Sequence, residues 1–140
     1  MYTHIYNNLL GIVHGMIGHN LTDTSQLKSI GKSLFGAKFT GVFARDKIPS
    51  HFTYVICNLD KTGRKGSHWL AIAKVSETPE YLVYDSFGRR TSDILPELLL
   101  PTIDTDNDAE QADNEKDCGQ RCLAWLSVFH LFGPQAAMTI

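Results

Sequence analysis

The sequence predicts an α+β fold, in which a short mixed or antiparallel sheet packs on a central buried helix. Three features favour this class. Runs rich in β-branched and aromatic residues follow one another at 52–59, 67–75 and 81–85, as in neighbouring strands. Residues 118–132 are apolar nearly all round, as in a helix that is covered on every side. The length of 140 residues fits a single domain, which buries roughly two thirds of the surface of its unfolded chain.

The segment before the sheet contains one well-marked helix. Residues 1–20 mix asparagines, glycines and histidines, and their pattern assigns them no element. A helix is predicted over 24–35, because Asp23 is a suitable N-cap, Gln26 stands at the reciprocal capping-box position and Gly36 ends the pattern. Its apolar residues recur at helical spacing, at Leu27, Ile30 and Leu34.

The middle of the chain is predicted to form the sheet. A polar turn is expected at 60–66, and residues 77–80 read as the connection of a β-hairpin. The predicted strands are 38–43, 52–59, 67–75 and 81–85.

The last third is predicted to contain two helices and a loop. A short helix is expected over 92–100, with Pro96 near its first turn, where proline is tolerated. Residues 102–117 are acidic and polar and are expected to form a loop. The central helix over 118–132 should end at Gly133-Pro134.

Composition excludes several classes of function. The formal net charge of −2 gives no general electrostatic reason to bind nucleic acid. No apolar run approaches the roughly 18 residues that span a membrane, so no membrane partner is expected. The three cysteines, an odd number, do not form a disulfide framework, and they favour a reducing compartment.

Cys118 is the strongest candidate for chemistry, because it opens an apolar helix. A thiol with an ordinary pKa of about 8.5 is mostly protonated at neutral pH, so a catalytic cysteine needs a stabilised thiolate and a base. The positive end of the helix dipole favours a thiolate at Cys118. Without partners, however, a cysteine in a buried helix is more often a small core residue.

Three further residues are candidates for the partners of this thiol. His68 lies at the mouth of one predicted strand and Asp85 at the end of the next, so both side chains can face one edge of the hairpin. Asp85 can then orient His68, which serves as the base for the Cys118 thiol. Gln111, in the loop that leads to Cys118, can donate its amide to an oxyanion together with the Cys118 backbone N–H. Taken singly, each of the three is more often a solvated residue.

In order and spacing these residues resemble the adenain family of adenovirus-type cysteine endopeptidases, in the superfamily of SUMO and ubiquitin-like protein proteases. The resemblance is carried by His68-Trp69, by residues 84–88 (YDSFG), and by Gln111 separated by six residues from Cys118-Gly119. It covers about residues 24–132. Three upstream segments are also similar to the family's first helix, first strand and the stretch that follows: 26–30, 39–43 and 45–49.

The chain 1–140 is then expected to be one cysteine protease domain, with an N-terminal segment over 1–20 that has no counterpart in the family. The resemblance implies that this domain matures virions by cleaving viral precursor proteins at glycine-containing sites. Cys118 is then the nucleophile, His68 the general base and acid, Asp85 the group that orients His68, and Gln111 the oxyanion donor.

The resemblance also implies where substrate and partners meet the enzyme. Trp69 and Gly119 are expected to line a narrow substrate cleft. No cofactor or metal is expected. The partners are protein substrates such as capsid or core precursors, and the place of action is the virion or the nucleus or cytoplasm of a host cell.

Activation is where the chain departs from the family. The adenovirus enzyme is activated by DNA and by a viral peptide held through a disulfide. No cysteine lies between Cys57 and Cys118, so the disulfide anchor is missing, and an activating peptide stays unknown. The acidic balance speaks against a DNA cofactor. The adjacent basic residues at 64–65 and 89–90 are interpreted as solvated turn residues.

Several alternatives compete with an endopeptidase. The same residues suit an isopeptidase that acts on SUMO or ubiquitin conjugates, and related folds transfer acetyl groups, although these usually need a longer chain. A virion protein that keeps the fold without activity is a third possibility.

Two candidate metal sites are interpreted as surface residues. Residues 104–115 partly match a calcium loop, with Ala109 at the position that needs glycine; the matching acids are Asp104, Asp106, Asp108 and Glu115. The histidines His4, His14 and His19 do not share a helix face at their spacing.

Overall fold

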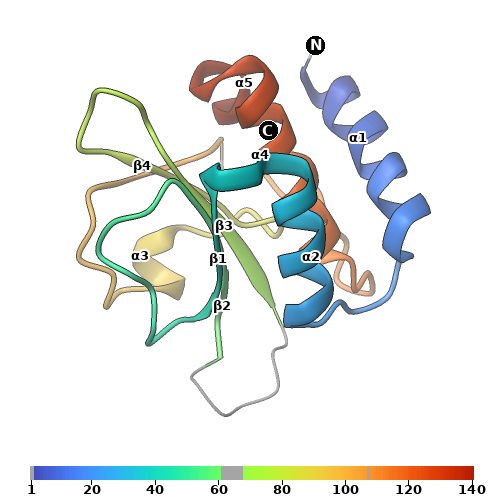
Figure 1. Ribbon diagram of the computed structural model, residues 1–140, viewed down its shortest axis with the longest axis horizontal. Coiled ribbons are helices and arrows are strands. Elements are labelled where there is room, and N and C mark those ends of the chain that lie inside the picture. The colour runs from blue at the N-terminus through green and yellow to red at the C-terminus, as the bar shows by residue number, and fades with distance from the viewer. Residues whose placement is uncertain (1, 61–67, 107) are drawn as a thin grey trace.

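The computed structural model describes residues 2–60, 68–106 and 108–140, and it has an α+β fold built on a five-stranded mixed sheet (Figure 1). The strands lie side by side in chain order. The outer pairs, β1 with β2 and β4 with β5, are parallel, whereas β2, β3 and β4 are antiparallel. This confirms the predicted class. The strands are β1 (Phe39–Ala44), β2 (Tyr54–Asn58), β3 (Trp69–Lys74), β4 (Tyr81–Tyr84) and β5 (Thr102–Asp104).

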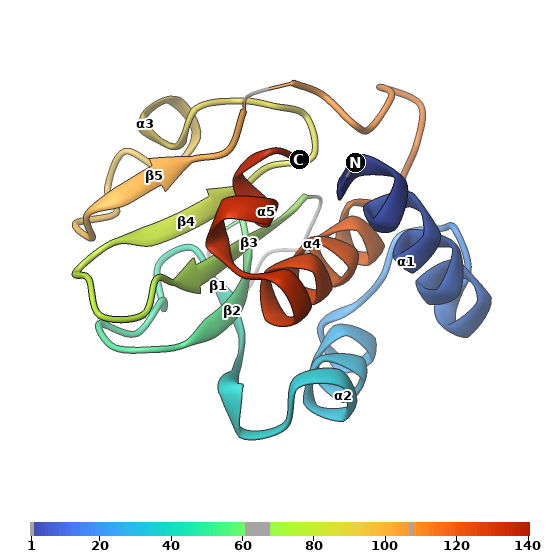
Figure 2. The same cartoon turned by 90° about the horizontal axis from the view of Figure 1, so that it is seen from above.

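Helices cover the two faces of the sheet unequally (Figure 2). One face packs on α1 (Tyr2–Ile17), α2 (Thr24–Phe35), α4 (Cys118–Phe132) and α5 (Pro134–Met138). The other face packs on the short helix α3 (Thr91–Ile94) and the chain around it. Alternation along β2 divides its side chains between the two cores, with Ile56 in the first and Val55 in the second.

The predicted central helix is confirmed as α4. Every residue from Cys118 to Phe129 is buried, and the helix packs against β3, α1, α2 and α5. Its Trp125 is fully buried and stacks on Tyr84 of β4, with ring centroids 5.4 Å apart. Because α4 is fixed along its whole length, its first residue is held in a defined place relative to the sheet.

Helix α2 has the predicted boundaries and the predicted cap. Asp23 Oδ1 accepts from the Gln26 backbone N–H at 2.8 Å, and Gln26 Oε1 accepts from the Asp23 backbone N–H at 3.0 Å. This reciprocal pair satisfies two backbone donors that a helix start leaves open. At the other end, Gly36 adopts a φ of 59°, a left-handed conformation that favours glycine.

Helix α1 corrects the view that the first 20 residues carry no element. Tyr6, Leu10 and Val13 are buried, at spacings of four and three, and they pack against α4 in the main core. Glycines and asparagines obscured this spacing. The N-terminal helix therefore belongs to the core of the domain.

Two other predictions at the C-terminal side need correction. The helix predicted over 92–100 is wrong beyond Ile94, because Pro96 disfavours a helical conformation at Leu95 before it. The predicted loop 102–117 contains β5, which extends the sheet beside β4. A further short helix, α5, follows Gly133. The turn expected at 60–66 lies outside the described residues, except for Asp60.

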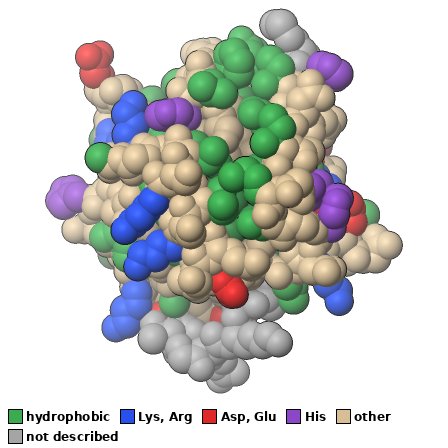
Figure 3. Space-filling model, turned by 45° about the vertical axis from the view of Figure 1, so that its right-hand side comes forward, with side chains coloured by type: hydrophobic (Ala, Val, Ile, Leu, Met, Phe, Trp, Pro, Cys, Tyr) green, Lys and Arg blue, Asp and Glu red, His purple; other side chains and the backbone are tan. Residues whose placement is uncertain are grey.

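The four predicted strands correspond to β1–β4, with ends that differ by one or two residues. Within the described residues, no helix has the length and apolar character needed to cross a bilayer. All three cysteines carry free thiols. Figure 3 shows the face that carries α1 and α2, on which hydrophobic side chains lie among polar ones; the exposed hydrophobic residues of these helices include Ile12, Met16 and Leu34.

Candidate active site

His68 and Asp85 meet at one end of the β3–β4 hairpin, as predicted. His68 precedes the first residue of β3 and Asp85 follows the last residue of β4, and antiparallel strands bring these two ends together. His68 Nε2 and Asp85 Oδ1 are 2.6 Å apart. Both residues are buried, so this hydrogen bond is shielded from water.

Cys118 joins this pair from the start of α4. The helix crosses the face of β3, and its first turn reaches the end of the strand next to His68. The His68 ring and the Cys118 thiol are within hydrogen-bonding reach of each other. Because Nε2 is taken by Asp85, the nitrogen that serves Cys118 is Nδ1. The structure therefore brings the three predicted triad residues together.

The electrostatics of the pair favour a charged histidine. Burial lowers the pKa of His68, but the hydrogen bonds to Asp85 and Cys118 outweigh it and raise the pKa above the ordinary 6.5. Burial by itself raises the pKa of Asp85, yet hydrogen bonds from His68 and Arg89 reverse the shift and lower this pKa to about 2. Asp85 is thus ionised at neutral pH and supports an imidazolium at His68.

The other two thiols lack such surroundings. Burial raises the pKa of Cys57 to about 12 and that of Cys122 well above its ordinary value. Both side chains are fully buried in the two cores. These cysteines are therefore protonated core residues, and Cys118 is the thiol that faces a base.

Gln111 is tied to the loop that carries Asp85. Its Oε1 accepts from Ser86 Oγ at 2.6 Å, its backbone N–H donates to the Ser86 carbonyl, and its Nε2 donates to the Glu115 carbonyl at 2.6 Å. One amide hydrogen of two is used in this way. The side chain is buried near the site, and its role as an oxyanion donor stays a prediction.

A hollow of about 380 Å³ opens beside these residues. It lies between the loop after β4 and the loop before α4. Its lining consists of Phe87, Arg89, Ala109, Gln111 and Asp113.

Trp69 and Gly119 are buried by the chain before α2. The Trp69 indole N–H donates to the Thr22 carbonyl at 3.2 Å. A Cβ added to Gly119 would lie 2.1 Å from Thr22 Oγ1, so this close approach of backbone and side chain requires glycine. These contacts give both residues a structural role; the predicted substrate cleft over them stays a prediction.

Arg89, interpreted from the sequence as a solvated turn residue, is exposed, and it also binds the buried carboxylate of Asp85. Its Nε donates to Asp85 Oδ2 at 2.8 Å, and its backbone N–H donates to the same oxygen at 3.1 Å. The sequence did not predict this contact, in which the guanidinium returns to Asp85 around a turn where Gly88 has a φ of 71°. A glycine three residues after a strand-end aspartate was the available signal.

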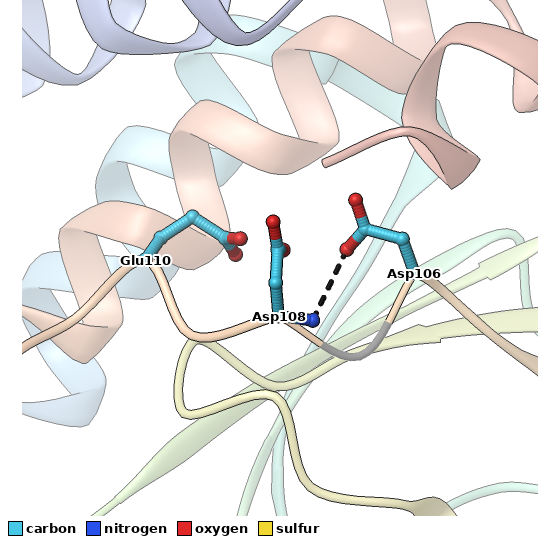
Figure 4. A group of neighbouring side chains, drawn as sticks. All are labelled: Asp106, Asp108 and Glu110. Atoms are coloured by element: carbon cyan, nitrogen blue, oxygen red, sulfur yellow. Dashed lines mark hydrogen bonds between the residues drawn. The ribbon is translucent and has the colours of Figure 1, made fainter.

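The acidic loop holds three carboxyl groups close together, although not the four of the calcium-loop pattern (Figure 4). Asp106, Asp108 and Glu110 have oxygens within 4.8 Å of one another. Asp104 instead accepts from the Thr91 backbone N–H, and Glu115 accepts from the Ala112 backbone N–H. The calcium-loop positions are therefore not brought together.

The histidines considered for a metal have other partners. His14 Nε2 is 2.8 Å from Asp117 Oδ2, and the His14 ring stacks on His19 with centroids 3.9 Å apart. In the parts of the chain that the structure describes, the acidic loop is the one place where three metal-ligating side chains gather.

Comparison of the chain with protein-family models and with curated proteins finds no match. The function proposed below therefore rests on the chemistry of the site and, for the substrate class, on the resemblance of the sequence motifs.

Proposed function

We propose that this protein is a cysteine protease, with Cys118 as nucleophile and His68 and Asp85 as its partners. The observation that carries the proposal is the convergence of Asp85, His68 and Cys118 at the start of a buried helix, where His68 is hydrogen-bonded to Asp85 and interacts with the Cys118 thiol. A nucleophile, a base and a group that orients the base are what acyl transfer needs.

The first half of the reaction forms an acyl-enzyme. His68 Nδ1 takes the proton of the Cys118 thiol, and the thiolate attacks the carbonyl carbon of the scissile bond. The oxyanion that forms accepts hydrogen bonds from the Cys118 backbone N–H and the Gln111 amide. When the C–N bond breaks, His68 returns its proton to the leaving amine, and a thioester remains on Cys118.

The second half frees the enzyme. Water enters in place of the amine and gives a proton to His68 as it attacks the thioester. The C–S bond then breaks, the product leaves as a carboxylic acid, and the proton on His68 returns to the Cys118 thiolate. Asp85 keeps the imidazole in place through both halves.

The substrate class follows from the resemblance of the motifs. We propose that the substrates are viral precursor proteins, capsid or core proteins among them, cut at glycine-containing sites in the virion or the host cell. An isopeptidase would use the same chemistry, so the identity of the cleaved bond separates these two functions.

Labelling with a peptide vinyl sulfone that ends in glycine tests the proposal. The probe should attach to Cys118, and mass spectrometry should locate it there. Cys118→Ala should abolish labelling and His68→Ala should reduce it strongly, while Cys122→Ala, a matched control one helical turn away, should keep it. Absence of labelling of the folded protein under reducing conditions would contradict a protease and favour a virion protein without activity.

Co-expression with candidate capsid and core precursors identifies the substrate. Cleaved bonds next to glycine in main-chain peptides would support the endopeptidase, whereas release of a lysine-linked modifier would support the isopeptidase. Transfer of an acetyl group without cleavage would contradict both.

A further inference from the structure

The loop 85–89 surrounds His68 on two sides. Asp85 holds the edge of the imidazole through Nε2, and Phe87 covers one face, with ring centroids 4.8 Å apart and planes tilted by 22°. The backbone makes this possible through a turn in which the Gly88 N–H donates to the Asp85 carbonyl at 2.9 Å. The left-handed conformation of Gly88 then directs Arg89 back towards Asp85.

Arg89 contacts both parts of this arrangement. Its Nε and backbone N–H donate to Asp85 Oδ2, while Oδ1 lies 2.6 Å from His68 Nε2 and also accepts from the Phe87 backbone N–H at 3.3 Å and from Arg89 Nη2 at 3.4 Å. Its guanidinium carbon lies 5.2 Å from the centre of the Phe87 ring, on a cation–π contact. Phe87 thus has contacts with both His68 and Arg89. Both carboxylate oxygens of Asp85 have hydrogen-bond partners.

The side chains of Asp85 and Arg89 differ in their exposure to solvent. The Asp85 side chain is 1% exposed, whereas the Arg89 side chain is 42% exposed. A buried carboxylate needs charged or hydrogen-bonding partners to stay ionised, and Arg89 supplies the second of its two charged partners. Arg89 reaches Asp85 from the solvent side and therefore acts on His68 through Asp85 and Phe87.

We propose that Arg89 is a positioning residue of the candidate active site, which fixes Asp85 and Phe87 so that the His68 imidazole stays directed at Cys118. The inference rests on the proposed function, since it assigns a part in the reactivity of Cys118. Loss of the guanidinium leaves Asp85 with His68 and the backbone N–H groups of residues 87 and 89 as partners, so the carboxylate is held less firmly, and it loosens the ring against which His68 is stacked. A misplaced base lowers the rate on the order of 10-fold to 10²-fold.

Alkylation of Cys118 by iodoacetamide tests this role without a peptide substrate. Arg89→Met should lower the rate of alkylation by that factor, and Arg90→Met, with the same change in charge one residue away, should leave it unchanged. Arg89→Lys should recover part of the rate, because lysine keeps the charge but loses the paired geometry. In an Asp85→Asn background, Arg89→Met should have a smaller further effect than in the wild type, since only its route through Phe87 is left.

A second readout follows the Asp85 carboxyl group directly. Carbon-13 NMR should show a higher pKa of Asp85 in Arg89→Met than in the wild type, and the wild-type value in Arg90→Met. Circular dichroism checks folding; where Arg89→Met does not fold, Arg89→Lys decides, and wild-type alkylation together with a wild-type Asp85 titration in that variant would overturn the proposal.

Failure of the proposed protease function and failure of the role of Arg89 would give different results. A wild-type Cys118 that reacts no faster than it does in His68→Ala would remove the proposed function. A wild-type Cys118 that depends on His68, together with equal rates in Arg89→Met and Arg90→Met, would leave the protease in place and overturn the role of Arg89.

Discussion

Asp85 and Glu110 stand in two loops that touch, and the pKa values of their carboxyl groups are shifted in opposite directions. The Glu110 backbone N–H donates to the carbonyl of Ser86, the neighbour of Asp85. Burial acts in the same direction on both carboxyl groups. Cationic partners nevertheless lower the pKa of Asp85 to about 2, whereas burial and the neighbouring Asp108 raise the pKa of Glu110 to about 9.

The comparison shows that the sign of the neighbours decides the charge of a buried acid. Asp85 has His68 and Arg89 as partners, so it is an anion that can orient a base. Glu110 has Asp106 and Asp108 as neighbours, so it is protonated at neutral pH. We expect the first loop to serve chemistry, and the second to contribute through Gln111 alone.

The largest expected effect is the difference between neutral isosteres at the two positions. Asp85→Asn should reduce peptide hydrolysis by about 10²-fold to 10⁴-fold without abolishing it, because the amide fails to hold the imidazolium. Glu110→Gln should change the rate by less than about threefold, since glutamine resembles the protonated acid already present. Initial rates on one peptide substrate measure both. Equal losses in the two variants would show that the comparison is mistaken.

Gln111→Ala tests the proposed oxyanion donor, which is the residue next to Glu110. Hydrolysis should fall on the order of 10²-fold, as for one lost donor, while alkylation of Cys118 should stay near the wild-type rate because alkylation forms no oxyanion. Parallel measurement of both reactions checks this. A hydrolysis rate equal to that of the wild type would remove Gln111 from the mechanism.

The pH dependence of stability should have opposite sign for the two acids. Asp85 has a lowered pKa, so its contribution is present above its ordinary 3.8 and is lost as pH falls towards about 2, a change of about 2 kcal/mol. Glu110 has a raised pKa, so its contribution is present below its ordinary 4.5 and is lost as pH rises towards about 9.

Urea unfolding of the wild type and the two isosteric variants between pH 2 and pH 9 measures these contributions. Asp85→Asn should remove part of the loss of stability at acid pH. Glu110→Gln should raise the free energy of unfolding relative to that of the wild type, and this gain should be larger at pH 8 than at pH 5. The same dependence of the free energy of unfolding on pH in all three proteins would argue against both pKa shifts.

Calcium should have the smallest effect. Asp106 and Asp108 are exposed, and Glu110 must release a proton before it can bind a cation. We expect only millimolar or weaker affinity in calorimetry, with Asp104→Asn as a control outside the acidic group. Micromolar binding would contradict the interpretation of these residues as a solvated loop.

Prediction from the sequence succeeded where the signal was local. The capping pair Asp23 and Gln26 fixed the start of α2, and the apolar run after Cys118 marked α4. The hairpin placed His68 beside Asp85, because two consecutive strands leave little choice of register. Cys118 lies far from both in the chain, and the three candidate triad residues were predicted together from their order and spacing.

Prediction failed where partners are distant in the chain. Helix α1 and strand β5 are stabilised by α4 and β4, and their own patterns are weak. The pairing of Arg89 with Asp85 is local in the chain, and Gly88 was its one available signal, but the direction of the Arg89 side chain depends on the backbone conformation at this glycine.

The sequence by itself determined the class of fold, the helix that carries Cys118, and the order of the residues at the candidate site, since these follow from periodicity, capping and strand succession. The tertiary structure decided the charge of each acid and the contacts of Arg89, Trp69 and Gly119. Burial and partner charge set those properties, and both depend on which distant segments come within a few ångströms of one another.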